Sequence, residues 1–269
     1  MLRSKIARHR RFLAIREALD GGTRRAFARA MSHNAPRALR LVLAPVLATA
    51  SMVACSSDPS VGPEPGDETV TSTSAVTAAQ VSSALAGGGF VVGQGKFAFL
   101  DMSQCCASSC AGNNPSSPYA AFYAPPAPGA PPEPGASADG LSNAFRLRSD
   151  EALVFVGPTP PEVRYFGFTP YLTDRAEADG SRRTVAASLS ETLNHLVLRV
   201  AGPSGTPVFG RTTAIVAAAD ATTRRKAVSA LVSAGIPLGA INQLVFDPAL
   251  GRFGLDAGGD TFSVLFRVA

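Results

Sequence analysis

The first clear pattern along the chain is an uncharged apolar run, LVLAPVLATASMVA, at residues 41–54, directly after the basic residues Arg37 and Arg40. As a helix, these residues would span about 21 Å, which is short of the roughly 30 Å hydrocarbon core of a bilayer. A short apolar run behind basic residues is typical of the central part of a signal peptide and not of a transmembrane helix.

From residue 90 onward, short stretches of β-branched and aromatic residues are separated by glycine, proline and aspartate, as in strands joined by turns. The stretches that predict strands are 90–101, 144–148, 152–156, 163–169, 196–200, 213–218, 241–246 and 262–268. Residues 115–138 contain eight prolines and predict a long surface loop, because proline is unfavourable in helices and in central strands.

The clearest helix is predicted at residues 222–234, with Asp220 or Thr222 as its N-cap and Gly235 at its end. A weaker helical pattern covers residues 74–86. The helix at 222–234 has a predicted strand on each side, which predicts a β-α-β crossover with parallel strands near the C-terminus. The expected fold class is therefore α+β, with one mixed β-sheet, and the alternative is a mainly β sandwich that carries one helix.

Charge divides the chain at Cys55. Residues 1–54 carry 11 basic and 2 acidic side chains, a net charge of +9, whereas residues 55–269 carry 14 basic and 18 acidic side chains, a net charge of −4. The basic part coincides with the predicted leader, so the remainder is mildly acidic. Because a nucleic-acid-binding surface is basic, we exclude nucleic acid as the main partner.

The apolar run ends in Met52-Val53-Ala54-Cys55. This sequence resembles the lipobox of bacterial lipoprotein precursors. The resemblance implies that residues 1–54 are a leader and signal peptide, that Cys55 is lipidated, and that the membrane is a partner through this anchor. Ser56, in place of Asp, implies the outer membrane in a Gram-negative cell.

Translation from Met31 would give the leader ordinary proportions, and we expect that start. Residues 55–73 are polar and rich in proline and glycine, which predicts a disordered tether behind the lipidated cysteine. Residues 74–269 are then expected to form a single globular domain.

Three further cysteines, Cys105, Cys106 and Cys110, are candidates for a disulfide, because export places them in an oxidising compartment. Adjacent cysteines bridge poorly, which favours Cys105 or Cys106 as the partner of Cys110. A metal site is the alternative, although the spacing lacks paired CxxC motifs and a nearby histidine. No metal or cofactor is predicted.

Asp220, Thr222, Thr223 and Arg224 lie where a strand is predicted to pass into a helix. Ligands of open α/β sheets bind at such an edge, and the free N–H groups of a helix N-terminus attract anions. A simple helix cap followed by a solvated basic turn is the favoured interpretation.

The densest aromatic cluster contains Tyr165, Phe166, Phe168 and Tyr171. On a strand, Tyr165 lies on one face, and Phe166 and Phe168 share the other. Tyr165 and Tyr171 are weak candidates for a sugar- or peptide-binding platform. A central strand whose phenylalanines build the core is favoured, since the chain has no tryptophan.

Catalytic groups are sparse. His195 is the one histidine after Cys55, and packing at the end of an element is favoured for it over catalysis. Asp256 and Asp260 flank a glycine turn, which is favoured over a cation site. The sequence favours a surface-displayed binding or structural domain. The alternative is an extracytoplasmic enzyme that uses serine or carboxylates such as Asp220 or Asp256.

Overall fold

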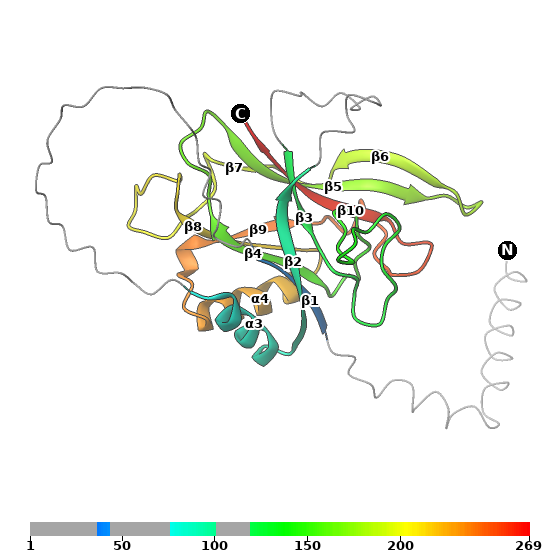
Figure 1. Cartoon of the computed structure of the whole chain (residues 1–269), viewed down its shortest axis with the longest axis horizontal. Helices are drawn as coiled ribbons and strands as arrows, with labels where there is room; N and C mark the ends of the chain where they lie inside the picture. The colour runs from blue at the N-terminus through cyan, green and yellow to red at the C-terminus, as the bar shows by residue number, and fades with distance from the viewer. Residues whose placement is uncertain (1–36, 44–75, 101–118) are drawn as a thin grey trace, which may run out of the picture. The chain divides into compact units, whose positions relative to one another are not determined.

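A computed structural model describes residues 37–43, 76–100 and 119–269, which form one mixed β-sheet with two α-helices (Figure 1). The elements are β1 (Arg37–Leu43), α3 (Ala78–Gly87), β2 (Phe90–Phe99), β3 (Tyr119–Tyr123), β4 (Ala152–Pro158), β5 (Phe166–Ala176), β6 (Arg182–Ser188), β7 (Leu193–Asn194), β8 (Thr212–Ala218), α4 (Ala221–Ser233), the 3₁₀-helix η2 (Leu238–Ala240), β9 (Ile241–Val245) and β10 (Thr261–Val268). The strand order is β6-β5-β10-β3-β2-β1-β4-β8-β9, and β7 pairs with β5.

The α+β class with a mixed sheet is confirmed, and the strands do not divide into the two packed sheets of a sandwich. The predicted crossover is β8-α4-β9, whose two strands are parallel neighbours. Asp220 caps α4, since its carboxylate accepts a hydrogen bond of 2.6 Å from the N–H of Thr223. Pattern, cap and crossover therefore agree in this part of the chain.

A second parallel crossover, β1-α3-β2, lies beside the first. The strand β1 pairs in parallel with β2 on one side and with β4 on the other. The sheet thus includes Arg37–Leu43, a segment that the sequence assigns to the leader, in addition to the domain expected from residue 74 onward.

Two predicted strands are wrong. Residues 196–200 form a turn and irregular chain, in which Leu196 and Val197 are exposed and Leu198 is buried. Residues 144–148 contribute only an isolated bridge between Phe145 and Phe262. In both segments the apolar side chains belong to the border of the core, where burial does not require a strand.

The proline-rich segment contains a strand that its composition obscures. Within residues 115–138, the run YAAFY forms β3, which lies between β10 and β2 near the middle of the sheet. Pro118 and Pro125 flank the run and no proline interrupts it, so every residue of β3 keeps a backbone donor. The prediction that 115–138 holds no central strand is therefore wrong.

The two faces of the sheet bury different cores. One face packs a phenylalanine-rich cluster that includes Phe122, Phe155, Phe168 and Phe266. The other packs small aliphatic residues of the strands under α3 and α4, with Leu231 of α4 fully buried. The two described helices, α3 and α4, do not cover this second face over β3, β5 and β10 (Figure 1).

No helix among the described residues is long and apolar enough to span a bilayer. Met31, the lipobox with Cys55, the tether at 55–73 and Cys105, Cys106 and Cys110 lie outside the described residues.

Candidate functional site

The four tyrosines of the chain lie on the face of the sheet that turns away from the phenylalanine cluster. Side chains alternate along a strand, so Tyr119 and Tyr123 of β3 lie opposite the buried Phe122. Tyr165 extends the ladder of β5 by exchanging backbone hydrogen bonds with Ala269, and Tyr171 follows on the same face. Segments far apart in the sequence thus bring the tyrosines onto one surface, here named the tyrosine face.

A cavity of about 190 Å³ opens on this face, here named the tyrosine cavity. Its lining comes from β3, β5, β10 and the loop before β7, and consists of Tyr119, Tyr165, Thr169, Tyr171, Thr192, Leu265 and Arg267. The hydroxyls of Thr169 and Thr192 are hydrogen-bonded at 2.8 Å. Strand register fixes the floor, because Leu265 of β10 lies opposite Thr169 of β5.

Arg267 is the cation of the tyrosine cavity. In the sheet register it lies between Tyr119 of β3 and Gly167 of β5. Its guanidinium carbon is 5.9 Å from the centre of the Tyr119 ring, within the range of a cation–π contact. It is exposed, and no carboxylate among the described residues forms an ion pair with it. Its charge is therefore accessible to an anion.

Gly167 makes room for the cavity wall. A Cβ atom at this position would lie 2.7 Å from the hydroxyl oxygen of Tyr165 and 2.7 Å from the Cγ2 of Thr192. Both contacts are too short for carbon, so any side chain here would displace Tyr165 or Thr192. Glycine thus lets the Tyr165 ring fold across β5.

The electrostatics of Tyr171 reflect its neighbours. Partial burial raises the pKa of the Tyr171 phenol above its ordinary value, with smaller contributions from Tyr119 and Tyr165, while Arg267 opposes the increase. Tyr171 is therefore a neutral hydrogen-bonding group at physiological pH.

His195 stands behind the tyrosine cavity and does not line it. Its ring lies edge-on to Tyr165, with centroids 5.8 Å apart, and packs near Phe166 and Phe209. Its backbone N–H donates to the carbonyl of Phe166. His195 therefore packs against aromatic rings at the start of the turn that follows β7.

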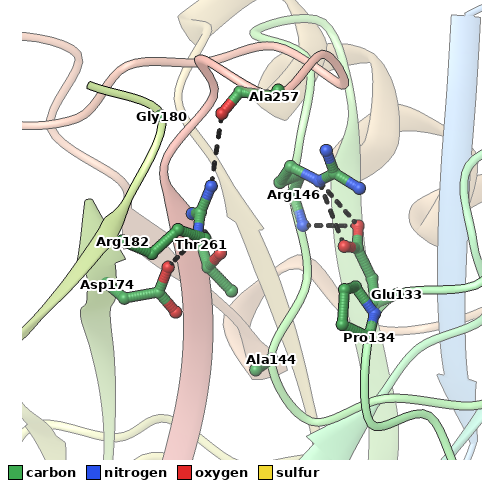
Figure 2. A pocket seen from close by; sticks show the side chains of 9 residues that line it. All are labelled: Glu133, Pro134, Ala144, Arg146, Asp174, Gly180, Arg182, Ala257 and Thr261. Atoms are coloured by element: carbon green, nitrogen blue, oxygen red, sulfur yellow. Dashed lines mark hydrogen bonds and ion pairs between the residues drawn. The ribbon is translucent and has the colours of Figure 1, made fainter. Parts of the chain in front are cut away.

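A second cavity, of about 260 Å³, lies between the proline-rich loop and the β5-β6 hairpin (Figure 2). Two ion pairs line it. Arg146 donates to Glu133 at 3.1 Å, and Arg182 pairs with Asp174 and also donates to the carbonyl of Gly259 at 3.1 Å. Figure 2 shows the two pairs side by side, and in each pair the arginine contacts the carboxylate. This cavity therefore offers less unpaired charge than the tyrosine cavity.

No family model matches the chain, and no curated protein or solved structure is significantly similar to it.

The predicted candidates at the start of α4 do not line a cavity described above. Asp220 caps the helix, and its pKa is lowered mainly by hydrogen bonds from Thr223. Arg224 donates to the carbonyls of Ala218 and Ala219, and the hydroxyl of Thr222 accepts from Arg225. These contacts are those of a helix cap.

Of the aromatic candidates, Tyr165 and Tyr171 enter the tyrosine cavity, whereas Phe166 and Phe168 are buried in the core. The sequence did not single out Tyr119 or Arg267. Alternation along TFSVLFRV places Ser263, Leu265 and Arg267 on one face of a strand, and this pattern could have indicated the face on which Arg267 lies.

The two carboxylates of the glycine turn have separate structural roles. Asp256 accepts hydrogen bonds from the N–H groups of Gly258 and Gly259 at 3.0 and 3.1 Å. Asp260 is fully buried and pairs with Arg175 at 2.9 Å. Within the described residues, no group of three or more metal-ligating side chains is present.

Proposed function

We propose that this chain is an exported lipoprotein of the cell envelope, anchored through Cys55, whose folded domain binds a ligand rather than transforming it. The observation that carries the binding role is the tyrosine cavity with the guanidinium of Arg267, which forms no ion pair with any described carboxylate.

The anchor is supported by the sequence. The basic residues, the apolar run 41–54 and Cys55 follow one another in the order of a lipoprotein signal peptide. The excess of basic residues before Cys55 fits a leader, and the acidic remainder fits an exported domain.

The binding role is supported by the lining of the tyrosine cavity. Its described lining offers three phenols, two threonine hydroxyls and one cation, and no carboxylate, imidazole or thiol stands among these described residues. Phenols combine apolar contact with hydrogen bonding at low entropic cost. This chemistry suits a ligand that carries a carboxylate or phosphate group beside hydroxyls, and it supplies no general base or activated nucleophile.

An extracytoplasmic enzyme is the alternative, and the second cavity gives it a specific basis because Glu133 and Asp174 both line that cavity. Each carboxylate is engaged by an arginine, which weakens the case for either as an acid or base. A hydrolytic activity lost on both Glu133→Gln and Asp174→Asn would favour the enzyme.

The anchor is tested by mass spectrometry of the protein from the envelope. We expect a diacylglycerol-modified N-terminus at Cys55, and we expect Cys55→Ser to leave the protein unlipidated. A modified N-terminus at another residue, or membrane association unchanged by the substitution, would contradict the anchor.

The binding role is tested by tyrosine fluorescence, which is not masked because the chain has no tryptophan and all its tyrosines lie on the tyrosine face. Acetate, inorganic phosphate and glucuronate are suitable probes at fixed ionic strength. We expect a saturable change with at least one probe, lost in Arg267→Gln and kept in Arg225→Gln on α4. Equal responses in both variants would contradict binding at Arg267.

A further inference from the structure

The strand β1 occupies a central position in the sheet although it precedes Cys55. It lies between β2 and β4, parallel to both, with Leu39 opposite Val92 on one side and Ala152 on the other (Figure 1). If residues 1–54 are removed, as the proposed function requires, this seven-residue strand leaves the sheet. The space between β2 and β4 is here named the strand slot.

The two described side chains of β1 define what the strand slot recognises. Leu39 is fully buried among Val81 and Leu85 of α3, on the helix-covered face. Arg40 is buried on the other face, 3.8 Å from the fully buried Glu151, and donates to the carbonyl of Arg146 at 3.0 Å. An apolar residue followed by a cation therefore fits this position.

The walls of the strand slot are joined by contacts that do not involve β1. On one face, the Phe97 ring of β2 meets the Phe155 ring of β4 with centroids 5.5 Å apart. On the other face, α3 and α4 share one apolar cluster, in which Leu85 and Leu231 are fully buried. Removal of β1 is thus expected to open a slot and not to separate the sheet into two bodies.

An empty strand slot is unfavourable for two physical reasons. The backbone groups of β2 and β4 that pair with β1 lose their partners in the middle of a sheet, where they resemble the open edges that other strands join. Glu151 also loses Arg40, and a buried charge without its partner is strongly destabilising. Arg148, at 3.6 Å from Glu151, is partly exposed and replaces only part of this interaction.

β1 itself fills the strand slot imperfectly. Among the described residues, Nε and Nη1 of Arg40 and Oε1 of Glu151 are buried without a hydrogen-bond partner. Unsatisfied buried groups cost free energy, so another segment that pairs them better would bind more strongly.

Apart from the partly exposed Arg148, no lysine or arginine of the processed chain forms an ion pair with Glu151 among the described residues. Between Cys55 and Lys96 the sequence contains no lysine or arginine, and the tether carries Asp58, Glu64, Asp67 and Glu68. A buried cation that takes the place of Arg40 beside Glu151 is then expected from another chain.

We propose that the strand slot of the processed protein binds an extended segment of a partner protein, parallel to β2 and β4, with an apolar residue at the Leu39 position and Arg or Lys at the Arg40 position. This inference rests on the proposed function, because only removal of residues 1–54 empties the slot.

The test uses the full chain with Cys55→Ser and a specific protease sequence inserted within residues 56–66. After cleavage we expect the leader fragment to co-elute with the rest of the chain and to be displaced by a labelled peptide of residues 35–45. Displacement is followed by fluorescence anisotropy. Loss of the fragment without any peptide binding would overturn the proposal.

The decisive control compares two peptides with the same change in charge. The Arg40→Glu peptide should bind at least about 30-fold more weakly, because it sets two carboxylates against each other in a buried site. A peptide with two glutamates added before residue 35 carries the same change in charge at a distance from Glu151 and should bind nearly as well as the parent. Equal weakening by both changes would show that only net charge is sensed, and would overturn the proposal.

A reciprocal variant checks that Glu151 reads the cation. In Glu151→Gln, the affinity ratio between the parent and Arg40→Gln peptides should fall toward one. An unchanged ratio, or a processed chain that dimerises with its slot filled by a second copy, would overturn the proposal. Processing before Cys55 is measured separately by mass spectrometry, so failure of the slot and failure of the anchor are distinguishable.

Discussion

The two parallel crossovers, β8-α4-β9 and β1-α3-β2, lie side by side and share the apolar cluster under their helices, but they are assembled differently. In the first, only Ala219 and Asp220 separate the strand β8 from α4, so the unit closes locally. In the second, residues 44–77 separate β1 from α3, and Cys55 lies within that connection.

This difference shows that two strands inside one sheet can differ in how firmly the chain holds them there. β8 is part of a short continuous unit, and its central residues Ile215 and Val216 are fully buried in opposite cores. β1 is tied to its crossover by a long connection, whose closure costs more entropy. We therefore treat the first crossover as permanent and the second as one whose first strand is exchangeable.

The largest expected effect is the difference in unfolding free energy lost when one fully buried leucine of each crossover is replaced by alanine. Leu231→Ala removes a fully buried side chain of α4 and should lower the free energy of unfolding by about 2–5 kcal/mol. Leu39→Ala removes an equally buried side chain, but its loss cannot exceed the free energy with which β1 docks between β2 and β4, so we expect a smaller loss than for Leu231→Ala. Urea unfolding of the full chain measures both. Equal losses would contradict an exchangeable β1.

Glu151→Gln sharpens the same comparison through charge. The variant leaves the buried Arg40 without the carboxylate of Glu151. We therefore expect β1 to leave the sheet while the rest of the domain stays folded. We expect faster protease cleavage within residues 44–75 than in the unsubstituted chain, with a smaller change in the unfolding midpoint than Leu231→Ala causes. A loss of all structure would instead show that β1 is integral to the domain.

The helix caps are expected to be equivalent, which isolates the strands as the source of the difference. Asp220→Ala removes the cap of α4, and Thr77→Ala removes the capping box of α3. Each should cost about 0.5–2 kcal/mol. Thermal unfolding of the two variants provides the measurement, and a Thr77→Ala effect far below this range would indicate that α3 contributes little to the fold.

The smallest effect concerns pH. The carboxyl of Asp139 accepts hydrogen bonds from Lys96 of β2 and from Ser137, which lower its pKa to about 2. The stabilisation is therefore present above the unfolded value and is lost as pH falls through about 2. NMR titration of the side-chain carboxyl is the check, and an ordinary Asp139 pKa would show that this link between Lys96 of β2 and the residue that follows the proline-rich loop does not form.

The permanent crossover was predictable because its signals are local. Asp220 precedes a continuous helical pattern, Gly235 ends it, and apolar strands lie on either side. The fold class followed from the same elements. The phenylalanines of β5 were also assigned correctly to the core, because alternation along a strand needs no knowledge of its neighbours.

The remainder depended on contacts between distant segments. The eight prolines of residues 115–138 led to the prediction of a loop where β3 forms. The leader-like composition gave no sign that Arg37–Leu43 pairs as a strand. Tyr119 and Arg267 meet only because β3 and β10 are neighbours, which no local pattern encodes. The sequence therefore predicted only Tyr165 and Tyr171 among the residues that line the tyrosine cavity.

Hydrogen exchange of the backbone amides tests the exchangeable strand most directly. The measurement compares the full chain with the purified chain that lacks residues 1–54, using β8 and β9 as an internal reference. We predict that the amides of β2 and β4 exchange faster after residues 1–54 are removed and slow again when the peptide of residues 35–45 is added, while β8 and β9 are unchanged. Equal protection of β2 and β4 with and without residues 1–54 would contradict the account.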